Sequence, residues 1–246
     1  SNLVNPIKDI YIKKFGDPKL TIDKNKKLIL IRIKNFDEKI LFINSKLEGW
    51  DIKVFANKVD TFKPSKSRID NNLLTSLITI KDSKIKNLKV YIDGGQHEDS
   101  LNIISSVGSI DRIEIKNSFQ DAIDFDFSDL KVDQIKVTNS GNDCIDTSAG
   151  KYFISKLKLV GCKDKGVSVG EESTLKVINA EIYNFGSSGA LGPVQYYLIY
   201  KNLASKYEHD SLIISFLCFF IFCNIWSKYL DVIQSLINLV GTDNKI

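Results

Sequence analysis

Short runs of alternating apolar and polar residues recur along the middle of the chain. The clearest are Ile113–Ile115, Ile135–Val137 and Leu157–Leu159, in which two apolar side chains flank one charged residue. Alternation with period two over such short runs predicts β-strands, because successive side chains of a strand point to opposite faces. Turn-forming residues separate the runs, so this region is predicted to consist of short strands rather than helices.

The apolar positions of these runs recur at a nearly constant interval of about 22 residues, which indicates an internal repeat. Three registers follow it: Leu101, Ile123, Ile145 and Val167; Ile113, Ile135, Leu157 and Ala180; and Ile115, Val137, Leu159 and Ile182. In the last two registers the final interval is one residue longer than the others, and this extra residue falls beside the loop at 171–173. A unit of this length is too short for a strand plus a crossover helix, which needs about 30 residues or more. It fits one coil of a solenoid, in which equivalent side chains stack about 4.8 Å apart.

Looser copies of the unit precede the regular ones. The segment Asn44–Ile52 matches Asp82–Val90 in residue character at most positions, so repetition is predicted to span residues 40–186. One turn column is predicted to hold Asn117, Asn139 and Asn184, interrupted by Gly161. Stacked asparagine amides of this kind form hydrogen-bonded ladders.

The repeat resembles a known fold. The run from Ile78 to Asn184 is similar to a right-handed parallel β-helix of the pectin-lyase-like superfamily. More narrowly, Asp121–Ser128, Gly141–Asp146 and Asp164–Glu171 resemble β-helix segments of bacterial proteins, some of which carry a kinase-like domain of the spore-coat-protein-H type. The resemblance implies an all-β, right-handed parallel β-helix and an extracellular or cell-surface location. It leaves activity open, because the superfamily includes lyases, hydrolases, epimerases and non-catalytic surface proteins.

Three regions are predicted. Residues 1–40 would form N-terminal strands or a cap, 41–189 the parallel β-helix, and 190–246 an irregular or helical tail of different composition. Within this tail, 212–226 is almost continuously apolar, but it is shorter than the roughly 18 residues or more expected of a membrane-spanning helix. The tail is interpreted as a cap on the solenoid, a membrane-associating segment or a frameshift product. Membrane contact is expected only through 212–226.

Composition narrows the partners and the chemistry. Of the 34 basic residues among 246, only three are arginine, and the net charge is +4. Nucleic-acid recognition is therefore not expected, because reading bases relies on the bidentate guanidinium group. The four cysteines show no C-x-x-C spacing, and Cys144 and Cys162 are interpreted as buried thiols rather than as a bridge or a nucleophile. The two histidines are too few and too far apart for a zinc site.

An acidic cluster gives the most specific hypothesis. In a strand through Ala122–Phe127, alternation places Ile123, Phe125 and Phe127 inside the solenoid, so that Asp124 and Asp126 face solvent.

Stacking adds further carboxylates to this pair. Asp146 would lie one coil from Asp124, with Asp121 and Asp143 stacked beside them. Dense hard oxygen donors suit Ca²⁺, so Asp124, Asp126 and Asp146 are predicted to hold Ca²⁺. The alternative is that these aspartates are turn and solvent-face residues, with Asp143 paired to the stacked Lys165.

A second hypothesis concerns catalysis. Lys165, beside Glu171, could act as the base of a polysaccharide lyase or epimerase if its pKa were lowered. The alternative is a structural salt bridge. Known active patterns are absent: the sequence has no Asp-Pro-His-Asp of alginate epimerases and no paired aspartates with Gly-His-Gly of polygalacturonases. Arg112 is the only arginine near the acidic coils, so whether the protein is an enzyme stays open.

Two function classes follow from the sequence. The first is a surface or extracellular β-helix module that binds or processes polysaccharide along an extended face. The second is a non-catalytic structural or interaction solenoid detached from a larger protein. A groove lined by convergent aspartate, lysine and aromatic side chains on the face of Asp124 would favour the first class, and a smooth face there would favour the second.

Overall fold

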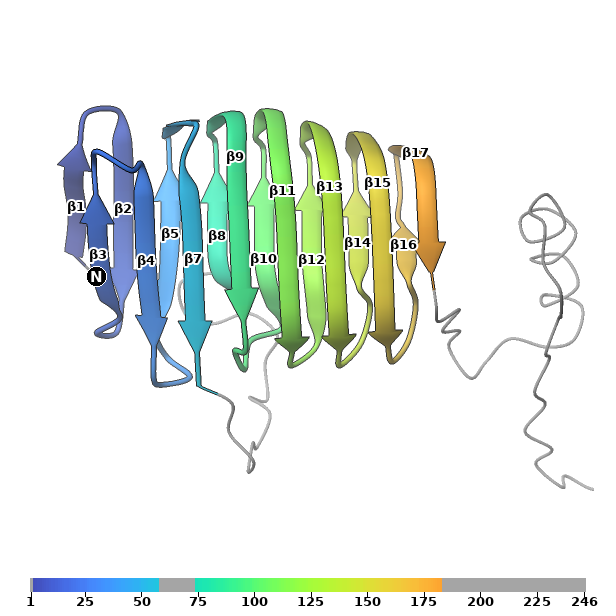
Figure 1. The fold of residues 1–246 in the computed structure, drawn as a ribbon, viewed down its shortest axis with the longest axis horizontal. Helices are drawn as coiled ribbons and strands as arrows, with labels where there is room; N and C mark the ends of the chain where they lie inside the picture. Colours follow the sequence, from blue (N-terminus) through green and yellow to red (C-terminus); the bar gives the residue numbers. More distant parts are fainter. Residues whose placement is uncertain (1, 58–73, 183–246) are drawn as a thin grey trace, which may run out of the picture. The chain divides into compact units, whose positions relative to one another are not determined.

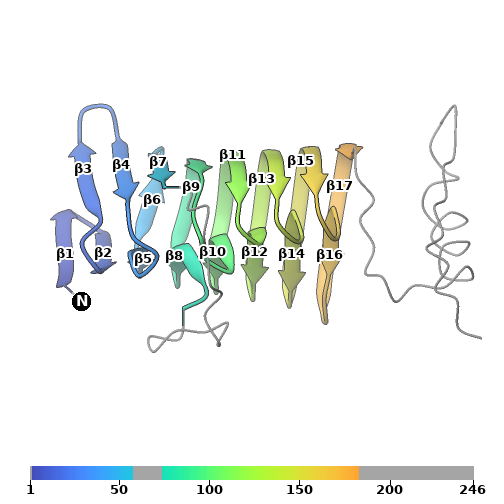
Figure 2. The ribbon, with the colours of Figure 1, turned by 90° about the horizontal axis from the view of Figure 1, so that it is seen from below.

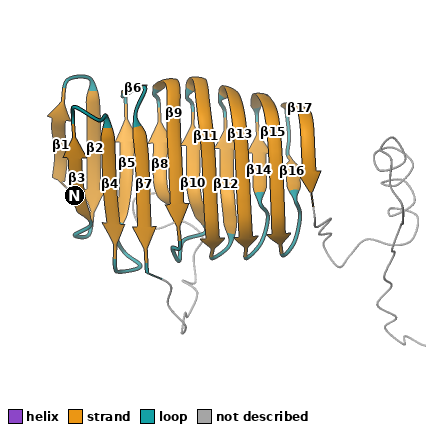
Figure 3. Ribbon diagram, in the orientation of Figure 1, coloured by secondary structure: helices purple, strands orange, loops and turns teal. Residues whose placement is uncertain are grey.

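The computed structural model describes residues 2–57 and 74–182, without the side chains of residues 2–6. These residues belong to one compact unit, Ser1–Gly186. The second unit, Ser187–Ile246, falls outside the described residues, as does the predicted tail at 190–246. The described part of the chain contains strands and no helix (Figure 3).

Two sheets face each other across the solenoid (Figure 1). The eight-stranded sheet contains, in spatial order, β1 (Asn2–Ile7), β2 (Ile10–Phe15), β5 (Lys39–Ile43), β8 (Ser76–Lys81), β10 (Asp99–Ile104), β12 (Asp121–Asp126), β14 (Ile145–Ser148) and β16 (Val167–Val169). The nine-stranded sheet contains β17 (Ser173–Ile182), β15 (Gly150–Cys162), β13 (Asp129–Ser140), β11 (Val107–Ser118), β9 (Lys84–Asp93), β7 (Asp51–Ala56), β4 (Leu28–Ile33) and β3 (Lys19–Asp23), and β6 (Lys46–Glu48) also pairs with β9.

From β8 onward the chain alternates between the two sheets, and each strand pairs in parallel with its equivalent one coil away (Figure 2). Antiparallel pairs occur only toward the N-terminus of the described residues, between β1 and β2, β2 and β5, and β3 and β4. The molecule is therefore a parallel β-solenoid, as the sequence predicts, and antiparallel strand pairs precede its regular coils.

The strand register confirms the predicted stacking. Ile123 pairs with Leu101 on one side and Ile145 on the other, and Ile145 pairs with Val167. The two registers of the nine-stranded sheet also pair at every predicted step. The extra residue lies between β16 and β17. Residues paired between β14 and β16 keep the usual separation, whereas Gly150 and Ser173, paired between β15 and β17, are one residue further apart.

One coil is longer than the others. Ile40 pairs with Ile78, and Asp51 pairs with Lys89. The sequence separation in both pairs exceeds the usual repeat interval by the length of the segment 58–73. That segment lies outside the described part of the chain. The register thus confirms the match of Asn44–Ile52 with Asp82–Val90 and shows that an insertion hides the regular period.

Isoleucine, leucine and valine side chains fill the space between the sheets. They form one continuous buried cluster that runs through the coils from Ile10 to Cys162. Burying each such side chain contributes about 1.5–3 kcal/mol, and stacking on an equivalent side chain keeps neighbouring coils in register. The core leaves the outward side chains of both sheets free to form functional surfaces.

The turn after each strand of the eight-stranded sheet repeats a backbone conformation. A residue with positive φ recurs there at Asn44, Asp82, Ser105, Phe127, Ala149 and Glu172. At another corner, Asn117 and Asn139 have φ of 56° and 61°, and Gly161 follows with 73°. The Asn139 amide donates a hydrogen bond to Asn117 Oδ1 at 3.4 Å, which confirms the predicted asparagine ladder at this step.

A buried serine follows the positive-φ residue in four successive coils: Ser45, Ser83, Ser106 and Ser128. The amide of each of the first three donates to the hydroxyl of the next, at 3.0–3.1 Å. Each hydroxyl in turn donates to the carbonyl two residues earlier in its own chain segment. At the next coil Gly150 replaces serine, and the Tyr152 hydroxyl accepts the Ser128 amide at 3.4 Å.

Candidate functional site

Strand β12 presents the predicted acidic pair on the outer face of the eight-stranded sheet. Ile123 and Phe125 are fully buried, as predicted, and Asp124 and Asp126 on the opposite face are half-buried. The prediction that Phe127 points inward is wrong, because its side chain is 67% exposed. Phe127 has φ of 49°, and this left-handed residue follows the end of the strand and breaks the alternation.

Asn102 is a member of this site that the sequence reasoning missed. It pairs with Asp124 in the parallel ladder between β10 and β12. Its Nδ2 donates to Asp124 Oδ2 at 3.3 Å and to Asp126 Oδ2 at 3.1 Å. The side chain is 4% exposed, and its Oδ1 has no hydrogen-bond partner among the described residues. The sequence signal that could have identified Asn102 is its position one repeat before Asp124, which places the two side chains next to each other in the stack.

Burial and mutual repulsion raise the pKa of two carboxyl groups in this cluster. The pKa of Asp124 is raised to about 9, first by burial and then by the nearby charges of Asp99, Asp126, Asp146 and Asp121. Burial also raises the pKa of Asp126, although the Asn102 amide opposes that shift. Asp146 pairs with Asp124 in the ladder between β12 and β14, and its Oδ1 accepts the Thr147 amide at 2.8 Å.

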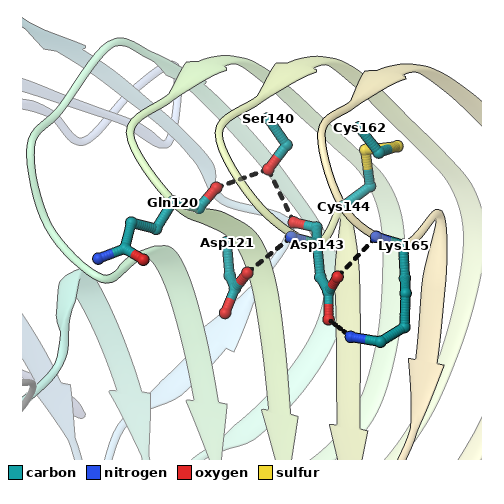
Figure 4. Close-up of a disulfide and its surroundings, with 7 residues drawn as sticks. All are labelled: Gln120, Asp121, Ser140, Asp143, Cys144, Cys162 and Lys165. Atoms are coloured by element: carbon teal, nitrogen blue, oxygen red, sulfur yellow. Dashed lines mark hydrogen bonds and ion pairs between the residues drawn. A yellow bond between two sulfur atoms is a disulfide. The ribbon is translucent and has the colours of Figure 1, made fainter. Parts of the chain in front are cut away.

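Asp121 and Asp143 form a separate group at the corner between the sheets (Figure 4). Asp121 Oδ1 accepts the Asp143 amide at 2.8 Å, and Asp143 Oδ1 accepts the Lys165 amide at 2.7 Å, so each buried carboxylate binds the backbone of the next coil. Burial raises the pKa of Asp121 to about 6, against its hydrogen bonds from Asp143 and Asn142. The predicted patch of five carboxylates is therefore divided between a structural corner and an outer face.

Lys165 belongs to the corner. Its Nζ lies 2.7 Å from Asp143 Oδ2 and 3.2 Å from Asp164 Oδ2, which is the ion pair expected under the structural alternative. Although burial alone lowers the pKa of Lys165, these two carboxylates raise it, so the protonated form is favoured. Among the described residues no hydrogen bond or ion pair joins the side chains of Lys165 and Glu171. Their catalytic assignment stays a prediction.

A disulfide lies beside this corner (Figure 4). Cys144 and Cys162 are bonded, with their Cα atoms 5.4 Å apart, so the interpretation as buried thiols is wrong. Coiling explains the pairing: Cys162 ends β15 and stacks on Ser140, which lies next to the turn that carries Cys144. The two cysteines, distant in sequence, thus become neighbours, and both are fully buried.

An open groove of about 350 Å³ lies on the outer face of the other sheet. Outward side chains of β7, β9 and β11 line it: Asp51, Lys53, Phe55, Lys89, Tyr91, Arg112 and Glu114. The groove combines acidic, basic and aromatic side chains, but it lies on the nine-stranded sheet and not on the face of Asp124.

Two aromatic rings line this groove side by side. The centroids of Phe55 and Tyr91 are 5.6 Å apart with a tilt of 48°. The Arg32 guanidinium lies 5.6 Å from the Phe55 centroid, and Lys116 Nζ lies 5.3 Å from the Tyr91 centroid. Each ring therefore makes a cation–π contact. Glu114 contacts Arg112 at 2.8 Å and Lys116 at 3.3 Å, and these cations, with Lys136, lower its pKa although burial alone raises it.

Comparisons with protein-family models, curated proteins and solved structures give no match for this chain. In residues 2–57 and 74–182, no three His, Cys, Asp or Glu side chains form a group that could hold a metal ion. The described part of the chain has no helix long and apolar enough to cross a membrane. The segment 212–226, proposed as membrane-associating, is outside that part.

Proposed function

We propose that this chain is a right-handed β-helix module that binds polysaccharide along the outer face of its nine-stranded sheet. The observation that carries the proposal is the groove in which Phe55 and Tyr91 lie among charged side chains. Sugar rings offer C–H faces that pack on aromatic rings, and hydroxyl groups that hydrogen-bond to charged side chains. An apolar floor with a few converging polar groups is the general form of a ligand site.

The ligand we propose is an extended, anionic polysaccharide. The groove spans three neighbouring coils, and it carries Lys53, Lys89 and Arg112 against Asp51 and Glu114. Beyond the groove, the column of Arg112 continues as Gln134 and Lys156, and the column of Glu114 continues as Lys136 and Lys158. A polymer lying along the solenoid axis would therefore meet the two aromatic rings and then the lysines of β13 and β15.

Two further points support an extracellular or cell-surface setting. The Cys144–Cys162 disulfide suits an oxidising environment, because such bonds are rare where the cell keeps thiols reduced. The coil segments also resemble the pectin-lyase-like superfamily and the β-helix segments of bacterial proteins with spore-coat-protein-H-type domains. Binding is preferred here to processing, because the contacts of Lys165 favour the protonated form over the free base.

The proposal is tested by titrating anionic and neutral polysaccharides into the protein and measuring binding by calorimetry. Tyr91→Ala and Phe55→Ala are expected to weaken binding of an anionic polysaccharide by about tenfold or more, since loss of a buried aromatic contact costs roughly 1–2 kcal/mol or more. Neutral polymers should bind more weakly than anionic ones.

The matched control is Phe127→Ala, which removes an exposed aromatic ring at a turn outside the groove and should leave binding unchanged. If neither anionic nor neutral polymers bind, or if Phe127→Ala weakens binding as much as Tyr91→Ala, the non-catalytic structural solenoid is the better interpretation.

A further inference from the structure

Glu114 is an unexpected neighbour for an anionic ligand. It lines the groove from β11, where the strand ladder pairs it directly with Tyr91 on β9 and with Lys136 on β13. An anionic group of a polymer that packs on Tyr91 would therefore meet a carboxylate of the protein before it reached the lysines of β13 and β15. Like charges on neighbouring strands repel each other, so the contacts of Glu114 decide whether an anion can bind beside it.

Three cations converge on the Glu114 carboxylate. Arg112 Nη2 lies 2.8 Å from Oε2, and Lys116 Nζ and Lys136 Nζ lie 3.3 and 3.7 Å from Oε1. Arg112 and Lys116 are two residues to either side along the same strand face, and Lys136 is the ladder partner one coil away. In the other ion pairs between described residues, each carboxylate contacts one lysine. The arrangement is that of an oxyanion site already occupied by a side chain.

The carboxylate is more deeply covered than the cations around it. The Glu114 side chain is 14% exposed, whereas the three basic side chains are 35–47% exposed. Burial raises the pKa of Glu114, but the three cations lower it to below its usual value, so the carboxylate is charged at neutral pH. The cations are therefore accessible to a ligand from the solvent side, while Glu114 holds them together from the protein side.

We propose that the three cations around Glu114 form an oxyanion subsite of the groove, and that its carboxylate competes for them with a carboxylate or sulfate group of the bound polymer. The ligand in this inference rests on the proposed function, whereas the subsite itself does not. The guanidinium group of Arg112 suits such a ligand, because it presents paired N–H donors to planar and tetrahedral oxyanions. Competition from Glu114 lowers the affinity for a single anionic group, so tight binding requires a polymer that carries several of them along neighbouring coils.

Inorganic sulfate tests the subsite without a polymer. The full chain, Glu114→Gln and Glu48→Gln are melted in sodium sulfate and in sodium chloride of the same ionic strength. Glu48→Gln is the matched control, because the Glu48 carboxylate is also exposed on the nine-stranded sheet but forms its ion pair with Lys86 alone, at 2.7 Å.

We expect sulfate to raise the melting temperature of Glu114→Gln by about 1–3 °C more than that of the wild type or of Glu48→Gln, at concentrations near or above its dissociation constant. Only Glu114→Gln leaves three cations without their carboxylate. The general stabilising effect of sulfate acts on all three proteins alike and cancels in the comparison.

Polymers with one backbone then test the competition. Dextran sulfate, carboxymethyl dextran and unmodified dextran are titrated into the same proteins by calorimetry. Glu114→Gln should bind the charged polymers about threefold to tenfold more tightly than the wild type, the order expected from partly exposed ion pairs. Adding Lys136→Gln to this variant should remove the gain. The charged polymer that gains more identifies the oxyanion, carboxylate or sulfate, that the subsite prefers.

The subsite and the polysaccharide proposal fail in different ways. A sulfate-dependent shift confined to Glu114→Gln, without binding of any polymer, would support the subsite and overturn the polysaccharide proposal. Equal sulfate responses of the wild type and Glu114→Gln would overturn the subsite, whether or not polymers bind. Polymer binding that is unchanged or weaker in Glu114→Gln would overturn the competition.

Discussion

At the scale of single residues, the buried serines after each turn solve a recurring problem. Each coil must pass from one sheet to the other. The turn leaves a buried backbone N–H group for which no strand carbonyl is the acceptor. The Ser106 hydroxyl accepts the Ser83 amide at 3.0 Å and donates to the Ile104 carbonyl at 2.9 Å. One side chain therefore satisfies polar groups of two coils. This requirement explains why serine recurs at a position surrounded by apolar residues.

Replacing Ser106 with alanine should lower the free energy of unfolding by about 1–3 kcal/mol, because the Ser83 amide loses its acceptor in a buried site. Urea denaturation measures the change. Ser155→Ala is the control, since the structure describes no hydrogen bond from that hydroxyl, and it should change stability by less than about 0.5 kcal/mol. Equal stability of Ser106→Ala and the wild type would contradict the role assigned to the hydroxyl.

Single residues also show where prediction from sequence works and where it fails. Ile123 and Phe125 could be placed inside because strand geometry alone fixes alternation. Phe127 could not, because its conformation depends on a turn whose residues share a backbone angle but not a side-chain type. Asn102 was visible in the repeat, but its role depends on contacts with two carboxylates that only the stacked coils create.

At the scale of strands and turns, regular elements could be predicted and long-range pairs could not. Strands β11, β13 and β15 show a clear period and occur at the expected interval. The groove is different, because Phe55 and Tyr91 are separated by the insertion at 58–73 that hides the period. The cysteine pair was missed for a similar reason, since its sequence separation of 18 is not a multiple of the coil length.

The disulfide should stabilise the coils that carry β14 and β15. Closing a loop of this length restricts the unfolded chain, and removing such a bond costs about 2–4 kcal/mol. We expect Cys144→Ala with Cys162→Ala to lose an amount in this range in urea denaturation. A reducing agent should destabilise the wild type similarly and leave the double variant unchanged. Unequal effects of reduction and of the double variant would indicate that the cysteine side chains contribute through packing.

At the scale of the whole molecule, the solenoid is close to one-dimensional. Each coil contacts mainly its two neighbours, so stability is a sum of coil and interface contributions, and a residue's position along the axis matters as much as its type. The burial pattern follows this logic. Val137 in β13 is fully buried between equivalents on both sides, whereas Val177 in β17 is half-buried and pairs only with Ile154 among the described residues.

The same substitution should therefore have different effects at the two positions. Val137→Ala removes two buried methyl groups and leaves a cavity with neighbours on both sides, which should cost about 2 kcal/mol or more. Val177→Ala should cost less than about 1 kcal/mol, because part of its surface already contacts water. Urea denaturation of the two variants measures the difference in the free energy of unfolding. Equal losses would mean that the coil of β17 is as well covered as the central coils, and that stability in this protein is not set by the number of neighbouring coils.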